Sequence, residues 1–121
     1  ILLIDDDEAV RDVTSGMLRL LGHRFEAFSS GQTAVESFEQ APDRFDLIIT
    51  DLSMPTMRGH EVIDYIRAAG ASHPVILISG NLRDLDPDES EANGVTLLTK
   101  PYQIEELAEA ITLAFNPPVR A

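Results

Sequence analysis

Continuous apolar runs recur along the chain, separated by segments in which apolar residues follow helical spacing. The runs are Ile1–Ile4, Leu47–Thr50, Pro74–Ser79 and Val95–Leu98, and Arg24–Ser29 adds a shorter, more polar one. Continuous apolar runs are typical of strands that are buried on both faces of a parallel sheet. The pattern therefore predicts five strands.

Helices are predicted between these strands and after the last one. The apolar positions at helical spacing are Val10, Val13, Met17, Leu18 and Leu21 in the first helix, Ala34, Val35 and Phe38 in the second, Val62, Ile63 and Ile66 in the third, and Ile104, Leu107, Ala108, Ile111 and Phe115 in the last. The first helix should end near Leu21, because Gly22 suits a left-handed cap. Asp86 and Pro87 begin a capping pattern that predicts a further short helix in the polar stretch 81–93.

Five strands and five helices in alternation predict an α/β fold, a doubly wound parallel sheet with helices on both faces. Such folds bind ligands outside the carboxyl ends of their strands. The length of 121 residues suits one domain, which we place at residues 1–116. Residues 117–121 are predicted to begin a proline-rich linker. Because the chain does not begin with methionine, we expect it to be part of a longer protein.

Composition excludes several classes of function. The formal net charge of −12 would repel nucleic-acid phosphates, so we expect no direct contact of this domain with nucleic acid. No apolar run approaches the roughly 20 residues of a membrane span, and no signal segment opens the chain, so we expect no membrane insertion and a cytoplasmic location. The chain has no cysteine, and its three histidines match no metal-binding spacing.

Polar side chains stand at the carboxyl ends of four predicted strands. They are Asp5, Asp6 and Asp7 after the first strand, Asp51 after the third, Ser79 after the fourth and Lys100 after the fifth. Clustered carboxylates repel one another unless a cation lies among them, and an all-oxygen ligand set favours Mg²⁺ or Mn²⁺. The alternative for the residues from Asp5 to Glu8 is that they cap and charge the first helix.

Lys100 is the only lysine in the chain, and the other basic residues are all arginine. A compact ammonium group on a flexible side chain can move to stay close to a negative charge that is added or removed nearby. The simpler alternative is that Lys100 is a surface lysine at a strand end. Ser79 has no histidine or acid placed to activate it, so we interpret its hydroxyl as a hydrogen-bond donor rather than a nucleophile.

Four motifs, in order and spacing, resemble the receiver domains of two-component response regulators, and the resemblance covers residues 1 to about 115. The motifs are Leu3–Asp7 with Arg11, Asp51–Pro55 with Gly59, Ser79–Gly80, and Lys100–Tyr102. The resemblance implies a flavodoxin-like sheet with strand order 2-1-3-4-5. It also implies that Asp51 accepts a phosphoryl group from a phosphohistidine of a sensor histidine kinase or histidine phosphotransfer domain, and that the domain then switches conformation.

The resemblance implies roles for other residues at the strand ends. Mg²⁺ would be held by Asp6, the side chain of Asp51 and the main-chain carbonyl of Ser53, with Asp5 acting through a bound water. The phosphoryl oxygens would be contacted by Lys100 and by the amides of Leu52 and Gly80, and the Ser79 hydroxyl would move toward them. The resemblance also implies a cis peptide bond between Lys100 and Pro101. Such a domain catalyses its own phosphotransfer and dephosphorylation and is not a turnover enzyme. We expect the parent protein to be a response regulator or a hybrid histidine kinase, and the strand end Ile78–Gly80 together with the absence of a basic dimer face favours the hybrid kinase.

Two features differ from the family pattern. Leu97 occupies a position that is usually aromatic, so we expect no aromatic toggle and hypothesise that the strand of Leu97 shifts together with the short helix in 81–93. The last predicted helix, Ile104–Phe115, has no basic residue, so the charge-paired dimer of winged-helix transcription factors is not expected and the oligomeric state stays open.

Three alternative functions fit the sequence less well. A haloacid-dehalogenase-like phosphatase needs a second acid where Ser53 stands, and the chain is too short for a cap domain. A nucleotide switch needs a phosphate-binding loop that is absent. A receiver-like interaction module that does not accept phosphate stays open.

Overall fold

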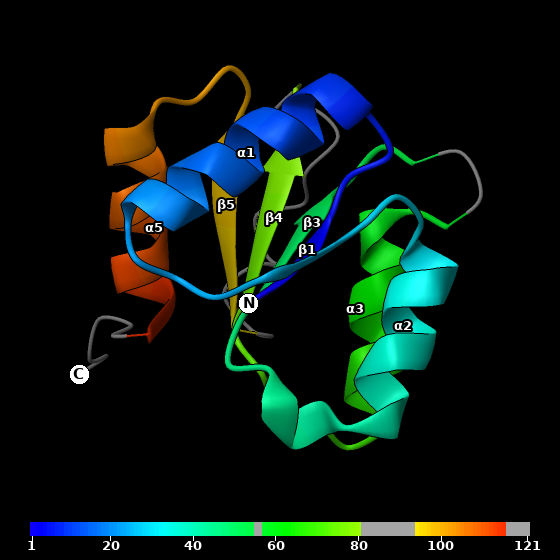
Figure 1. Ribbon diagram of the computed structural model, residues 1–121. Helices are drawn as coiled ribbons and strands as arrows, with labels where there is room; N and C mark the ends of the chain where they lie inside the picture. The colour runs from blue at the N-terminus through cyan, green and yellow to red at the C-terminus, as the bar shows by residue number, and fades with distance from the viewer. Residues whose placement is uncertain (55–56, 81–93, 116–121) are drawn as a thin grey trace.

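The computed structural model describes residues 1–54, 57–80 and 94–115 (Figure 1). Its five strands are β1 (Leu2–Ile4), β2 (Glu26–Phe28), β3 (Ile48–Asp51), β4 (Val75–Ser79) and β5 (Val95–Thr99). All neighbouring strands run parallel, in the order β2-β1-β3-β4-β5. The doubly wound, flavodoxin-like sheet and its strand order are therefore confirmed.

Four α-helices lie in the described part of the chain: α1 (Glu8–Leu20), α2 (Gly31–Gln40), α3 (Gly59–Ala68) and α5 (Ile104–Phe115). The short helix predicted in 81–93 and the linker predicted at 117–121 lie outside the described residues. A 3₁₀ turn, η1 (Pro42–Arg44), was not predicted, because three residues are too few to show a helical period. Among the helices that are described, none is long and apolar enough to cross a membrane.

The helices form two layers, with α1 and α5 on one face of the sheet and α2 and α3 on the other (Figure 1). Successive side chains of a strand point to opposite faces, so β1, β3, β4 and β5 each contribute to two cores, whereas the edge strand β2 is mostly exposed. Leu2 and Ile4 pack toward α2 and α3, whereas Leu3 packs toward α1 and α5. Burial on both faces explains why these four strands are continuous apolar runs rather than alternating ones.

The start of α3 lies directly against the carboxyl end of β3. A Cβ atom on Gly59 would lie 2.7 Å from the main-chain oxygen of Asp51 and 3.0 Å from the Cα of Leu52. The Gly59 amide donates a hydrogen bond to the carbonyl of Leu52 at 3.0 Å. Only glycine permits this close approach, and the contact holds the backbone on the carboxyl side of Asp51.

Candidate functional site

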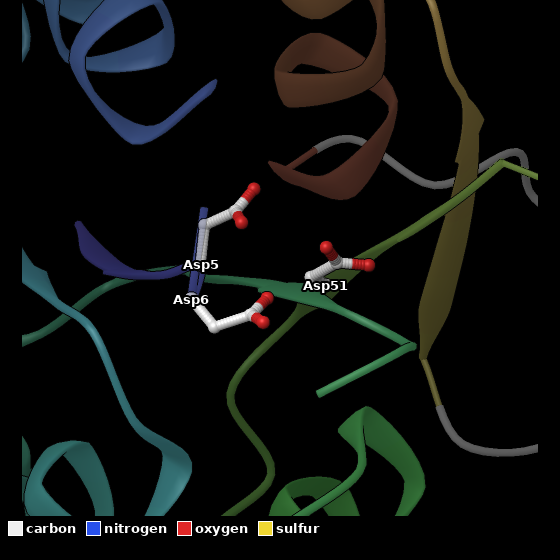
Figure 2. A group of neighbouring side chains, drawn as sticks. All are labelled: Asp5, Asp6 and Asp51. Carbon is white, nitrogen blue, oxygen red and sulfur yellow. The ribbon is translucent and has the colours of Figure 1, made fainter. Parts of the chain in front are cut away.

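Three carboxylates meet at the carboxyl ends of β1 and β3. Asp5 and Asp6 follow β1, Asp51 ends β3, and one oxygen of each lies within 4.8 Å of the others (Figure 2). Their proximity follows from the pairing of Ile4 with Thr50, which brings the next residue of each strand side by side. Asp5 and Asp51 are buried, with 1% and 4% of their surfaces exposed.

Lys100 supplies the positive charge beside these acids. Its Nζ donates to Oδ2 of Asp51 at 2.7 Å and lies 3.9 Å from Oδ2 of Asp5. Burial raises the pKa of Asp5, and the Asp7 amide and the Lys100 charge offset this only in part. Partial burial acts to lower the pKa of Lys100, but the hydrogen bond and charge of Asp51 outweigh it, so this pKa is raised.

The donor set fits a small divalent cation. With all four groups ionised, three carboxylates and one ammonium leave the cluster with an excess of negative charge. The three carboxylates offer oxygen ligands only, which Mg²⁺ prefers, and Asp6 is exposed to solvent. Among the described residues, the cluster of Asp5, Asp6 and Asp51 can hold a metal ion.

The amides that follow Asp51 have different partners. The Leu52 amide donates to the carbonyl of Ile78 at 2.8 Å, which continues the ladder between β3 and β4. The Ser53 amide donates to Oδ1 of Asp51 at 3.1 Å. The prediction that the Leu52 amide covers a phosphoryl oxygen therefore does not fit this backbone, because its hydrogen is engaged in the sheet. The amide that faces the carboxylate is that of Ser53.

Ser79 and Gly80 lie at the end of β4, beside the segment that carries Lys100. Ser79 is buried, and its carbonyl accepts a hydrogen bond from the Lys100 amide at 2.8 Å. The peptide bond between Lys100 and Pro101 is cis. The structure thus brings Ser79, Lys100 and Asp51 to one edge of the sheet, as the strand ends predict.

Leu97 lies away from this edge, within β5. It pairs with Leu77 across the sheet and packs, partly buried, against the core under α2 and α3. The helix that we predict to move with it falls in residues 81–93, outside the described part of the chain. The packing shift of Leu97 therefore stays a prediction.

Asp7 caps α1 and does not join the metal-competent cluster. Its side chain accepts hydrogen bonds from the amides of Ala9 and Val10, at 3.0 and 3.2 Å. Its own amide donates to Oδ1 of Asp5 at 2.9 Å. The helix-capping alternative is therefore confirmed for Asp7, while Asp5 and Asp6 face Asp51.

Replacing Asp7 with alanine should lower the free energy of unfolding by about 1 kcal/mol, because two amides of the first helical turn lose their acceptor. Magnesium affinity should change little, because an exposed charge outside the cluster is screened by solvent. Urea unfolding without metal and calorimetric Mg²⁺ titration measure the two quantities. Asp12→Ala, on the exposed face of α1, is the control. A loss of Mg²⁺ affinity as large as that of Asp6→Ala would show that Asp7 is a ligand.

Contacts of α1 with the Lys100–Tyr102 segment and with Asp5 were not predicted from the sequence. The hydroxyls of Thr14 and Tyr102 form a hydrogen bond, and Nη1 of Arg11 donates to the carbonyl of Asp5 at 2.8 Å. A groove of about 560 Å³ lies between α1 and this segment, lined mainly by apolar side chains. The one available signal was a polar residue, Thr14, four positions from Val10 and from Leu18 on an apolar helix face.

A parallel α/β sheet with acids, a serine and a lysine gathered at its strand ends is the arrangement expected of a phosphoacceptor signalling domain. Residues 1–112 match the family described as response regulator receiver domain. The chain therefore belongs to the response regulator receiver family of two-component signal transduction. Domains of this family accept phosphoryl groups from histidine kinases and bind Mg²⁺ at an acidic pocket.

Known proteins similar to the chain agree with this assignment. The response regulator protein FleR of Pseudomonas aeruginosa is 31% identical over 92% of this chain and 23% of its own length. The response regulator protein TodT of Pseudomonas putida is 32% identical over 96% of this chain and 51% of its own length. The chain thus spans about half or less of these relatives.

Among solved structures, a response regulator receiver domain protein from Clostridium thermocellum superimposes with a TM-score of 0.84. The two are 26% identical, and the match covers 95% of this chain and 92% of that one.

Proposed function

We propose that Asp51 is the residue that accepts the phosphoryl group. The observation that carries this proposal is the position of its buried carboxylate, which lies 2.7 Å from the ammonium of the chain's only lysine and within a cluster of three acids. A carboxylate in this position can act as a nucleophile, and the phosphoryl group that it accepts would lie next to the Lys100 ammonium, which is positively charged. None of the other carboxylates described forms an ion pair this short with Lys100.

Phosphoryl transfer depends more on the alignment of the phosphoryl donor with its acceptor than on covalent catalysis by other protein groups. An oxygen of Asp51 forms a bond to phosphorus while the bond from phosphorus to the donor's histidine nitrogen breaks, and the electron pair returns to the imidazole. The partner in this proposal is a sensor histidine kinase or a histidine phosphotransfer domain. The result is an aspartyl phosphate that carries more negative charge than the carboxylate it replaces.

The chain's own groups are placed to receive that charge. Asp6, Asp51 and the carbonyl of Ser53 would hold Mg²⁺, with Asp5 acting through a water, and the metal would neutralise phosphoryl oxygens. Lys100 follows the new charge on its flexible stem. The amides of Ser53 and Gly80 donate to the remaining oxygens, and Ser53 takes the role that the family resemblance implies for Leu52.

The conformational switch in this proposal begins at Ser79. Its hydroxyl moves toward the phosphoryl group, as a charge-assisted hydrogen bond is stronger than a neutral one. Because Ser79 pairs with Thr99 across the sheet, its movement reaches β5 and Leu97. Packing of Leu97, rather than an aromatic rotamer, then carries the change to the α2 and α3 face.

Incubation with acetyl phosphate tests the proposal without knowledge of the partner kinase. With Mg²⁺ present, the intact mass of the chain should rise by one phosphoryl group, and chelation of the metal should prevent the rise. A receiver-like module that does not accept phosphate gives no adduct under either condition. Absence of the adduct from the folded protein with Mg²⁺ would therefore favour that alternative.

We further propose that the chain is the receiver part of a longer protein, with the domain at residues 1–116 and a linker from 117. The larger lengths of FleR and TodT support this proposal, because each extends well beyond the matched region. Any contact with nucleic acid would then belong to another part of the protein, since this part carries a net charge of −12.

A further inference from the structure

The position of the Lys100 ammonium depends on how firmly the backbone beneath it is held, because the lysine stem is long and flexible. On the strand side, the Lys100 amide donates to the Ser79 carbonyl at 2.8 Å. On the other side stands Pro101, which has no amide hydrogen and is exposed. The next residue that can anchor the segment is Tyr102.

Tyr102 is anchored at both its ring and its hydroxyl. The ring packs against the core under α1 and α5, and the hydroxyl lies 2.5 Å from the hydroxyl of Thr14 in the middle of α1. Thr14 is 1% exposed and Tyr102 is partly buried, so the bond is largely shielded from solvent at the floor of the groove. It joins residues 88 positions apart in the chain.

The helix that carries Thr14 is itself attached to the acid cluster. Asp7 caps its first turn, and Arg11 donates to the carbonyl of Asp5 at 2.8 Å. The hydroxyl pair therefore connects the segment bearing Lys100 to α1, the helix that Arg11 attaches to Asp5. A tyrosine phenol is protonated at neutral pH, and burial raises the pKa of Tyr102 further.

We propose that Thr14 and Tyr102 are positioning residues for phosphoryl transfer, whose hydroxyl bond holds the Lys100 segment on α1 and so keeps the ammonium on Asp51. This inference rests on the proposed roles of Asp51 and Lys100. A merely structural bond would stabilise the domain without changing the mobility of the lysine. The two possibilities can therefore be separated by observing Lys100 directly.

Tyr102→Phe removes the hydroxyl and keeps the ring. Phosphorylation by acetyl phosphate should slow about 5- to 10-fold, since small displacements of a catalytic group are costly. Because Lys100 is the only lysine, ¹³C-lysine labelling gives one side-chain Cε signal, and its order parameter should fall. Tyr65→Phe is the matched control, because it removes another tyrosine hydroxyl bond, to Glu39 on the exposed surface. It should change neither quantity.

Substitutions at Thr14 complete the test. Thr14→Val should reproduce the Tyr102→Phe effects, Thr14→Ser should restore the wild-type values, and the double variant should be no slower than either single one, because both remove the same bond. Thermal unfolding establishes that each variant is folded at the assay temperature. A wild-type order parameter and rate in Tyr102→Phe would overturn the proposal. If the wild type accepts no phosphate, the proposed function fails, and the lysine order parameter still decides whether the hydroxyl pair holds Lys100.

Discussion

Replacing Asp51 with asparagine should abolish phosphorylation of the chain by acetyl phosphate. The carboxamide has nearly the shape of the carboxylate, and its oxygen can still accept the hydrogen bond from the Ser53 amide, which spans 3.1 Å in the structure. It lacks the anionic oxygen that attacks phosphorus, so no acyl phosphate can form. Intact mass measured after incubation with Mg²⁺ should show no adduct at any time.

Asp46→Asn is the matched control for this prediction. Asp46 is an exposed aspartate shortly before the same strand, β3, so the substitution changes the same charge without touching the acid cluster. Its adduct should form at the wild-type rate. A phosphoryl adduct that persists in Asp51→Asn would place the acceptor on another residue and would contradict the proposed function.

Asp51→Asn should also weaken Mg²⁺ binding, because the cluster loses one of three carboxylates. Calorimetric titration measures this loss independently of phosphorylation. The Asp46→Asn control should keep the wild-type affinity, since its charge is exposed and screened.

The sheet could be predicted because local sequence patterns indicate its strands. Continuous apolar runs such as Ile1–Ile4 reflect burial on two faces, and polar residues that end such runs must lie at one edge of a parallel sheet. The pairing of Ile4 with Thr50, which brings Asp5 and Asp51 together, has no local signal. It joins strands that are not consecutive in the chain, so strand order came from the family resemblance rather than from periodicity.

Details that depend on backbone direction could not be predicted. Successive amides at the end of β3 point in different directions, so the Leu52 amide enters the sheet while the Ser53 amide faces Asp51. The residue types around Asp51 do not reveal which amide does which. The bond between Thr14 and Tyr102 could not be predicted for another reason. A threonine on an apolar helix face does not indicate which residue it will bond, and its partner lies 88 residues away in the chain.

Replacing Lys100 with methionine should have opposite effects on phosphoryl transfer and on Mg²⁺ binding. Transfer should slow by about 10²- to 10³-fold, a typical cost of removing one group that stabilises charge in a transition state. Magnesium should bind about fivefold more tightly, because a cation that lies 2.7 Å from Asp51 and 3.9 Å from Asp5 no longer repels it. Methionine retains the length of the stem, so packing changes little.

The rate of adduct formation at saturating Mg²⁺ and the calorimetric Mg²⁺ affinity separate these effects. Arg58→Met is the matched control, because it removes one positive charge from an exposed side chain on the loop that follows Asp51. It should leave both quantities near their wild-type values. If Lys100→Met weakens Mg²⁺ binding and transfer together, the lysine acts by holding the acid cluster in shape. A gain in metal affinity with a loss of transfer supports a role of its charge in transfer, because general disruption of the acid cluster would weaken both.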